Sequence, residues 1–208
     1  MAEFNLTEKS IITESDLQKI PAGAQLMISA DARLTPLAHD YVAAHSLTIL
    51  RKRRGDTRVR KLAIGADHGG FQVKEKLKVW LAGKGIEVQD FGTHDERAVD
   101  YPDYAHAVAS VVGNGTFPLG ILLDGAGIGS CMVANKVPGV RAAMCYDIAS
   151  ARNSREHNDA NVLTLGAKML SEEKILEVVE AWLNSVIRED RHIQRVNKIK
   201  QVEARYLR

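Results

Sequence analysis

The run Leu119-Gly120-Ile121-Leu122-Leu123, followed by Asp124-Gly125-Ala126-Gly127-Ile128-Gly129, decides the fold of this chain. An unbroken apolar run of this length is typical of a strand buried on both faces of a parallel sheet. The glycines favour a tight turn, and we expect a helix after them through about Lys136. A strand, a turn and a helix in this order predict one crossover unit of an α/β fold.

The same pattern continues on both sides of this run. We expect strands at 62–66, 86–90, 119–123, 140–145 and 162–165, and further helices at 71–82, 104–112, 148–156 and 172–186. Strands that alternate with helices of roughly 10–15 residues need crossover connections, which place helices on both faces of a parallel sheet. The sequence therefore predicts a three-layer α/β/α domain with a five-stranded parallel sheet.

Composition narrows the class of protein. The 208 residues are 45% hydrophobic and 26% charged, which is typical of a globular protein with one domain and a small addition. The net charge of +2 is too small to indicate a nucleic-acid partner. No apolar stretch approaches a membrane span, and the N-terminus lacks a signal pattern, so we expect no membrane partner and a cytoplasmic location. Cys131 and Cys145 form neither a disulfide framework nor a metal motif.

The chain is expected to have unequal parts. Residues 1–50 read as a small N-terminal α/β segment, residues 51–60 as a basic linker, and residues 61–208 as the main domain with a helical tail. Within the first segment, Thr13 is expected to cap a short helix, and Thr35-Pro36 to begin another between strands at 25–30 and 47–50. Because fifty residues bury little surface, this segment is expected to lean on the main domain or on a partner.

Polar clusters adjoin three of the expected strands. Asp67-His68-Gly69-Gly70 follows the first strand and Asp124–Gly129 follows the third, at the edge where open parallel sheets bind ligands. Arg155–Asp159 precedes the fifth strand, so it belongs to the other end of the sheet. It could reach the site through the chain's own geometry or from a second subunit.

The glycine-rich turn suits an anion such as phosphate, because glycine lets backbone amides approach a ligand closely. Its spacing is not that of the dinucleotide fingerprint, which argues against NAD. Two structural interpretations stay open at this point. The turn could serve only tight strand–helix packing, and Asp67 could simply cap the next helix.

Six motifs occur in order along the chain: Ile64–Phe71, Asp90–Thr93, Val99–Ala105, Gly125–Gly129, Ala134–Ala143 and Glu156–Leu163. Together they resemble the type-B ribose-5-phosphate isomerase and galactose-6-phosphate isomerase family, from Lys61 to about Lys200. The resemblance implies a Rossmann-like fold and a homodimer, or a tetramer, with active sites at the subunit interface. It also implies the interconversion of an aldose phosphate and a ketose phosphate without a metal or organic cofactor.

The resemblance also assigns roles to residues. Asp67 and His68 would contact the sugar, and His157 would open its ring, with Asn158 beside it. The catalytic residues would be Asp124, His157 and Asp67. Further substrate contacts would come from Tyr101, Gly125, Gly127, Ile128 and Gly129. Phosphate would be held by Arg191, Arg195 and the adjacent His192, and the spacing of the two arginines places them on one helix face.

Two positions depart from the family pattern. Asp124 stands where the family usually has the cysteine that acts as base, and Ala126 stands where a threonine is common. A partly desolvated carboxylate can also remove a proton next to a carbonyl, and loop amides could replace the threonine hydroxyl. The favoured interpretation is an isomerase with a carboxylate base. The alternatives are an isomerase of another substrate, such as a hexose phosphate, and a retired enzyme that only binds sugar phosphate.

The N-terminal segment lies outside this resemblance. Ile12–Leu17 and Leu34–Ala38 are similar to the start of the cobalamin adenosyltransferases of ethanolamine-degrading bacterial microcompartments. This implies that a microcompartment shell could handle the enzyme through residues 1–50. The alternative is an accessory cap on the fold.

Overall fold

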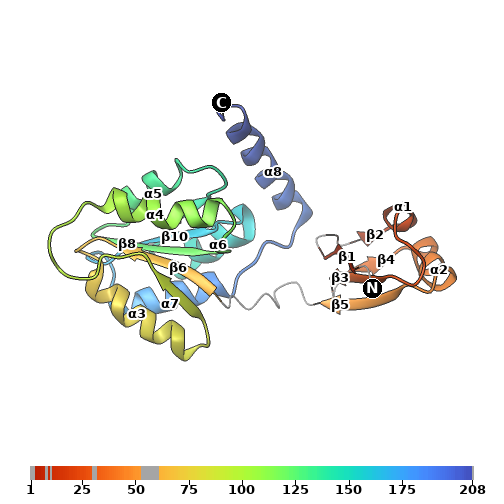
Figure 1. The fold of residues 1–208 in the computed structure, drawn as a ribbon, viewed down its shortest axis with the longest axis horizontal. Helices are drawn as coiled ribbons and strands as arrows, with labels where there is room; N and C mark the ends of the chain where they lie inside the picture. The colour runs from red at the N-terminus through yellow and green to blue at the C-terminus, as the bar shows by residue number, and fades with distance from the viewer. Residues whose placement is uncertain (1–2, 8, 10, 30–31, 53–60, 208) are drawn as a thin grey trace. The chain divides into compact units, whose positions relative to one another are not determined.

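The computed structural model describes residues 3–7, 9, 11–29, 32–52 and 61–207. The chain divides into two compact units, residues 1–57 and residues 58–208, each with its own core (Figure 1). None of the described helices is long and apolar enough to cross a membrane.

The larger unit contains the five-stranded parallel sheet that the sequence predicts. Its strands lie in the order β7-β6-β8-β10-β9. Their bounds are β6 (Lys61–Ala66), β7 (Glu87–Asp90), β8 (Gly120–Asp124), β9 (Ala142–Met144) and β10 (Val162–Gly166). All five residues of β8 and of β10 are buried, as the continuous apolar runs indicate.

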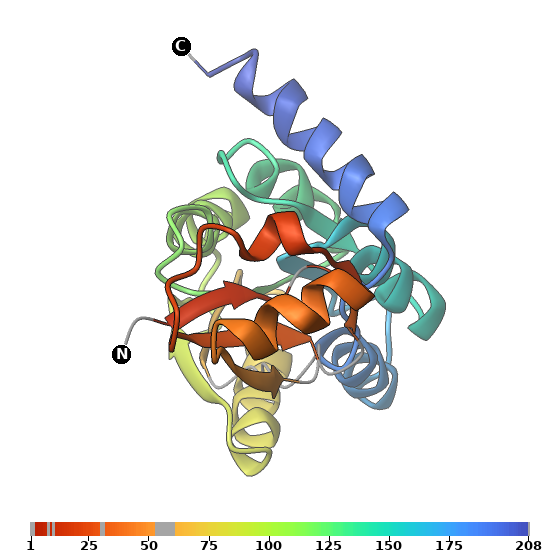
Figure 2. The same ribbon diagram turned by 90° about the vertical axis from the view of Figure 1, so that its right-hand side faces the viewer.

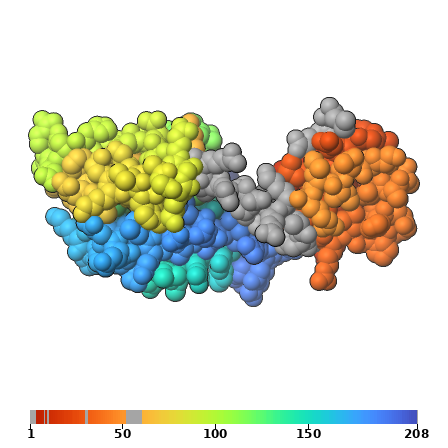
Figure 3. All heavy atoms as spheres, turned by 90° about the horizontal axis from the view of Figure 1, so that it is seen from below, coloured from red at the N-terminus to blue at the C-terminus, as the bar shows by residue number. Residues whose placement is uncertain are grey.

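Helices cover both faces of this sheet and complete the three-layer Rossmann-like fold. Figure 1 shows α4 (Tyr101–Gly113) and α5 (Ile128–Ala134) on one face, and α3 (Phe71–Gly83) and α7 (Glu172–Leu183) on the other. Figure 3 shows α3 and α7 side by side on the surface, where Lys84, the C-cap residue of α3, pairs with Glu180 of α7 at 2.6 Å. α6 (Ile148–Asn158) contributes to the same core as α3 and α7.

The C-terminal tail forms the helix α8 (Asp190–Ala204), which extends away from the rest of its unit (Figures 1 and 2). His192 and Val196 are its buried residues. The apolar side chains of Ile199, Val202 and Tyr206, further along this end of the chain, are 45%, 52% and 82% exposed. An apolar surface of this kind is unusual in a helix that has all of its partners.

Several element boundaries differ from the expected ones. α4 begins three residues early, because Asp100 takes the N-cap position and Pro102 fits the first turn. β9 is shorter than expected at both ends. At its start, the Arg141 amide donates to the Asn161 side chain at 2.7 Å rather than to a neighbouring strand.

The smaller unit is a parallel sheet in the order β1-β3-β5, with a separate β2-β4 pair and two helices. Its elements are β1 (Glu3–Leu6), β2 (Ile11–Ile12), α1 (Glu14–Leu17), β3 (Gln25–Ser29), β4 (Arg33–Leu34), α2 (Pro36–Ala44) and β5 (Thr48–Lys52). The Thr35 hydroxyl accepts a hydrogen bond from the Ala38 amide, so the predicted cap of α2 is present. β5 continues through Lys52, two residues into the expected linker, and the rest of that linker, 53–60, lies outside the described residues.

Candidate active site

The strand order places a ligand site between β6 and β8. The chain leaves β6 for β7 on one side and then returns to β8 on the other, so the carboxyl ends of β6 and β8 form the switch point at which open parallel sheets bind ligands. Asp67 and His68 follow β6, and the glycine loop, residues 125–129, follows β8. Both clusters thus lie at the carboxyl end of the sheet, as their positions in the sequence indicate.

Asp124 is the last residue of β8, and its side chain is only 4% exposed. Its Oδ1 accepts hydrogen bonds from the amides of Ala126, at 2.8 Å, and Gly127, while its Oδ2 accepts one from Ser130 at 3.0 Å. A carboxylate offers about four acceptor positions. These three amides occupy three of them, which leaves one lone pair on Oδ2 for another partner.

Other contacts fix the glycine loop from outside. The Tyr146 hydroxyl donates to the Ala126 carbonyl at 2.9 Å, and the Thr164 hydroxyl donates to the Gly127 carbonyl at 2.8 Å. Gly127 has a φ of +79°, and a Cβ there would lie 2.9 Å from the Gly166 nitrogen, so glycine is required at this point. The loop is therefore held in one conformation by its neighbours.

Three amides of this region have no acceptor among the described residues: those of Gly125, Ile128 and Gly129. Preorganised amides of this kind can stabilise an oxygen that becomes negative during a reaction. The amides of Ala126 and Gly127 cannot contribute in this arrangement, because the Asp124 carboxylate already occupies them.

The remaining predicted residues of this end of the sheet lie around the loop. Asp67, which is 9% exposed, accepts a hydrogen bond from the Gly70 amide at 3.0 Å. Gly70 is itself the N-cap of α3, which has no side-chain cap, so Asp67 orders the turn before the helix and does not cap it. The His68 Nδ1 lies 3.2 Å from the Val99 carbonyl. The Tyr101 ring lies against Gly129, since a Cβ there would be 2.5 Å from its Cζ.

Lys168 lies beside the glycine loop and is a candidate site residue that the sequence motifs do not indicate. Its Cε lies 3.5 Å from where a Cβ on Gly69 would be, and its Cδ lies 3.7 Å from the equivalent point on Gly125. The side chain is exposed, and it forms no ion pair with any residue that the structure describes. Its position in the sequence, two residues after β10 and at the same end of the sheet, could have indicated that it lies near the glycine loop.

The other predicted residues form a second cluster where α6 ends and α8 begins. His192 is 2% exposed, and its ring stacks on that of His157 with centroids 4.0 Å apart and planes at 11°. Burial, with a smaller effect from His157, lowers the pKa of His192. Arg191 donates to Glu189 at 2.6 Å, which lowers the pKa of that carboxyl, and both Arg191 and Arg195 are exposed.

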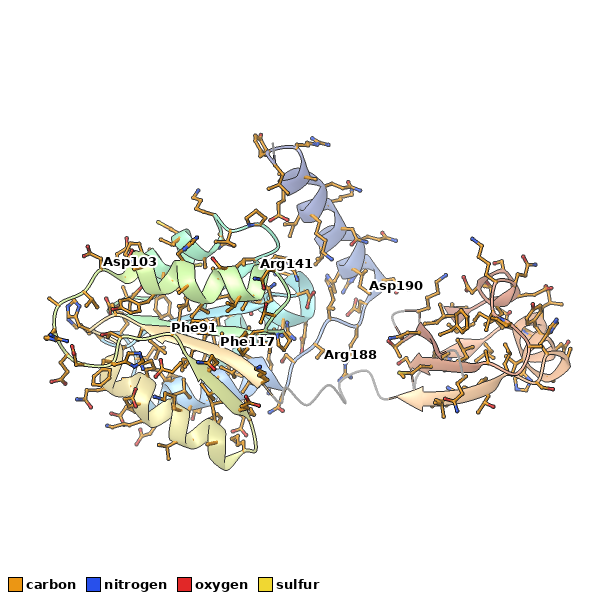
Figure 4. The ribbon with its side chains drawn as sticks, in the orientation of Figure 1. Phe91, Asp103, Phe117, Arg141, Arg188 and Asp190 are labelled. Carbon is orange, nitrogen blue, oxygen red and sulfur yellow. The ribbon has the colours of Figure 1, made fainter. Side chains whose placement is uncertain are left out.

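This second cluster lies at the opposite end of the sheet from Asp124. α6 ends just before Val162, which pairs with Gly120, the first residue of β8. Asp124 is four residues further along β8, a rise of roughly 13 Å. Figure 4 shows the same separation, with Asp103 of α4 at one end and Arg141 and Arg188 at the other. Within one chain, the structure therefore does not bring Asp124 together with these residues: His157, Asn158, Arg191, His192 and Arg195.

Cys131 does not replace the family's usual cysteine. It lies in α5, its Sγ is 3.5 Å from the Ala142 carbonyl, and burial raises the pKa of its thiol. Among the described residues, no three His, Cys, Asp or Glu side chains are grouped so that they could hold a metal ion.

The family described as Ribose/Galactose Isomerase matches residues 62–199, which is most of the larger unit. This chain belongs to the ribose/galactose isomerase family. It is thereby an aldose–ketose isomerase of the sugar-phosphate class, and the family match does not include the smaller unit.

Three relatives illustrate the range of the family. Ribose-5-phosphate isomerase B of Escherichia coli is 42% identical over 147 residues, which are 71% of this chain and 99% of the relative. D-erythrulose-4-phosphate isomerase of Pectobacterium atrosepticum is 39% identical over 140 residues, 66% of this chain and 91% of the relative. The structure of ribose-5-phosphate isomerase B from Clostridium thermocellum is 45% identical and matches with a TM-score of 0.69 over 71% of this chain and 99% of that one.

Proposed function

We propose that this isomerase interconverts ribose 5-phosphate and ribulose 5-phosphate, with Asp124 as the base that moves a proton between carbons 1 and 2. The observation that carries this proposal is the free lone pair on Oδ2 of a buried carboxylate, placed at the switch point of the sheet. The identity to ribose-5-phosphate isomerases favours the pentose phosphate as substrate.

The proposed chemistry needs one base and a set of hydrogen-bond donors. Asp124 Oδ2 takes the proton from carbon 2 of the open-chain aldose, which gives an enediolate. The proton returns to carbon 1, while the proton of the carbon-2 hydroxyl moves to the oxygen on carbon 1. The free amides of Gly125, Ile128 and Gly129 would stabilise the enediolate oxygens.

The substrate's phosphate would be held by cations from both ends of the sheet. Lys168 supplies an unpaired ammonium group beside the glycine loop, and Arg191 and Arg195 supply a pair of guanidinium groups. Because these arginines lie at the opposite end of their own chain, they would belong to the site of a second copy.

We therefore also propose a homodimer in which each site combines Asp124 of one protomer with His157 of its partner. The exposed apolar side chains near the C-terminus support this arrangement, because they border a cavity of about 830 Å³ between α8 and residues 135–143. A second copy that covered this region would bury apolar surface and complete both sites at once.

The direct test is exchange of the carbon-2 proton with solvent deuterium, measured by NMR on a panel of aldose phosphates. Ribose 5-phosphate is expected to exchange fastest. The D-erythrulose-4-phosphate isomerase relative makes a four-carbon substrate the second candidate, and a hexose phosphate is the third. Binding of ribose 5-phosphate without any exchange would instead identify a retired enzyme.

Three variants distinguish the proposed role of Asp124 as a base from its structural role in holding the loop. Asp124→Asn is expected to abolish exchange, whereas Asp124→Cys, which introduces the family's usual residue, should retain measurable exchange. Asp103→Asn changes an exposed carboxylate at the same end of the sheet and should have no effect. Full exchange in Asp124→Asn would refute the assignment of the base.

For the smaller unit we propose attachment to a microcompartment shell. Support comes from its separate core and from the resemblance of its sequence to shell-associated adenosyltransferases. Removal of residues 1–50 should change co-localisation with a shell in cells and leave turnover intact. Unchanged localisation would count against this role.

A further inference from the structure

His157 is held on one edge by a side chain of its own helix. The Asn153 Nδ2 lies 2.9 Å from the His157 Nδ1, one turn earlier on α6. The other ring nitrogen, Nε2, has no hydrogen-bond partner among the described residues, and His157 lines a cavity of about 320 Å³ together with Arg188 and Glu189. One edge of the ring is thus occupied, and the other is available.

Two contacts of Asn158, both at the length limit of a hydrogen bond, fit one orientation of the Asn153 amide. The Asn158 Nδ2 lies 3.5 Å from the backbone carbonyl of Asn153, which can only accept, so this end of Asn158 donates. The same Nδ2 lies 3.5 Å from the Asn153 side-chain oxygen, which leaves the Asn153 Nδ2 for His157. An amide nitrogen only donates, so the His157 Nδ1 must accept and carries no proton.

A second constraint on the His157 side chain acts on the face of its ring. His192 is buried and stacks on His157, and neither of its own ring nitrogens has a hydrogen bond. Its Nε2 is 3.6 Å from the Glu189 carboxylate, too far for one. Burial lowers the pKa of His192, so a neutral ring covers one face of His157 and limits its rotation.

We propose that Asn153 is a positioning residue that holds His157 as the neutral tautomer with its proton on Nε2. This inference rests on the proposed ring-opening role of His157. The ring then acts as a hydrogen-bond donor to the substrate and not as a base, because its Nε2 has no lone pair to offer.

The chemistry follows from that tautomer. When the furanose ring of ribose 5-phosphate opens, the bond between carbon 1 and the ring oxygen breaks and its electron pair stays on that oxygen. The carbon-1 hydroxyl loses its proton and becomes the carbonyl, and solvent water carries this proton to the ring oxygen. The Nε2–H stabilises the negative charge that develops on the ring oxygen during the transfer.

Nitrogen-15 NMR of histidine-labelled protein tests the tautomer directly, with His157→Gln used to assign the signals. The wild-type protein should show the His157 proton on Nε2. Asn153→Asp replaces the donor by an acceptor of the same shape and should move the proton to Nδ1, while Asn114→Asp, at an exposed turn, should leave it in place. A wild-type ring protonated on Nδ1 would overturn the proposal.

Kinetics with two substrates distinguish a specific defect in ring opening from a general structural defect of the variant. Ribose 5-phosphate forms a ring, whereas erythrose 4-phosphate cannot form a five-membered ring because its fourth oxygen carries the phosphate. Asn153→Asp should lower kcat for ribose 5-phosphate by about tenfold and leave that for erythrose 4-phosphate unchanged. Equal losses with both substrates would mean a structural role and defeat the inference. If neither substrate turns over in the wild type, the proposed function fails, and the NMR result still decides the role of Asn153.

Discussion

At the scale of single residues, the proposed role of Asp124 requires its two oxygens to bind both the loop and the substrate. Its three amide contacts fix the side chain, so little rotational freedom would be lost when a substrate binds. The same contacts remove two loop amides from any role in binding an oxyanion. We infer that the site depends on the Gly125, Ile128 and Gly129 amides and on nearby cations more than the glycine-rich sequence alone indicates.

Lys168 gives a prediction about substrate affinity. Lys168→Met keeps the length of the side chain and removes an unpaired charge beside Gly69 and Gly125. The KM for a sugar phosphate should rise by roughly tenfold, the effect of one charge-assisted hydrogen bond, while kcat changes little. Steady-state kinetics measure both constants. Lys174→Met, which removes a lysine already paired with Glu177, is the control, and an equal effect there would contradict the prediction.

Gly127 gives a prediction about the shape of the loop. Gly127→Ala would be strained by the φ of +79° and would also bring a Cβ to 2.9 Å from the backbone of β10. Gly115→Ala has almost the same φ, +80°, but open space around it, so it should cost only about 1 kcal/mol of unfolding free energy. Gly127→Ala should cost roughly 1–3 kcal/mol more and abolish turnover. Urea unfolding and exchange assays would show this, and similar losses in the two variants would argue against the close contact.

At the scale of helices and strands, the sequence predicts the larger unit well because its signals are local. Continuous apolar runs indicate β8 and β10, and the polar residues after β6 and β8 lie at the carboxyl end of the sheet, as predicted. The position of Lys168 could not be predicted, because it depends on how three loops meet in space. The short strands of the smaller unit were only partly expected, since two-residue strands such as Ile11–Ile12 carry no periodicity.

A buried ion-pair network connects α3 with the end of β7. Lys74 is fully buried and pairs with Asp90, and Lys78 reaches the same carboxylate at 2.6 Å. The other oxygen of Asp90 accepts a hydrogen bond from the Gly92 amide at 2.9 Å, at the start of the loop that leads to Tyr101. Burial raises the pKa of Asp90, but these donors more than offset it, so its pKa lies below the ordinary value.

This network gives the protein an acid-sensitive element. Since the folded pKa of Asp90 lies below the unfolded one, its contribution is present above about pH 4 and is lost as the pH falls through the folded pKa. Asp90→Asn leaves a buried ammonium poorly compensated and should lower the unfolding free energy at neutral pH by about 3 kcal/mol. Its stability should also depend less on acid than that of the wild type. Denaturant unfolding across the pH range tests both effects. Asp103→Asn, at an exposed carboxylate, is the control and should behave like the wild type.

At the scale of the whole molecule, the proposed site draws on two groups of residues that lie at opposite ends of the sheet within each chain. One has Asp124 and the glycine loop at the carboxyl end of the sheet, and the other has His157 and the arginines of α8 at the amino end. A two-fold symmetric dimer can join unlike halves from two chains and does so twice. Under this proposal, a monomer would have no complete site.

Mixing two inactive variants tests this arrangement. Asp124→Asn and His157→Gln should each be inactive on ribose 5-phosphate as pure homodimers, because every site in them lacks one residue. In a heterodimer, one site lacks both residues and the other has both. Equal amounts that re-associate at random should therefore recover about a quarter of the wild-type activity per site, since half of the dimers are mixed and each has one intact site.

Refolding the two proteins together from denaturant, followed by the isomerisation assay, measures the recovery. The two variants mixed without refolding provide the baseline. No recovery after refolding, with dimers present by light scattering, would place Asp124 and His157 in separate sites and refute the shared one.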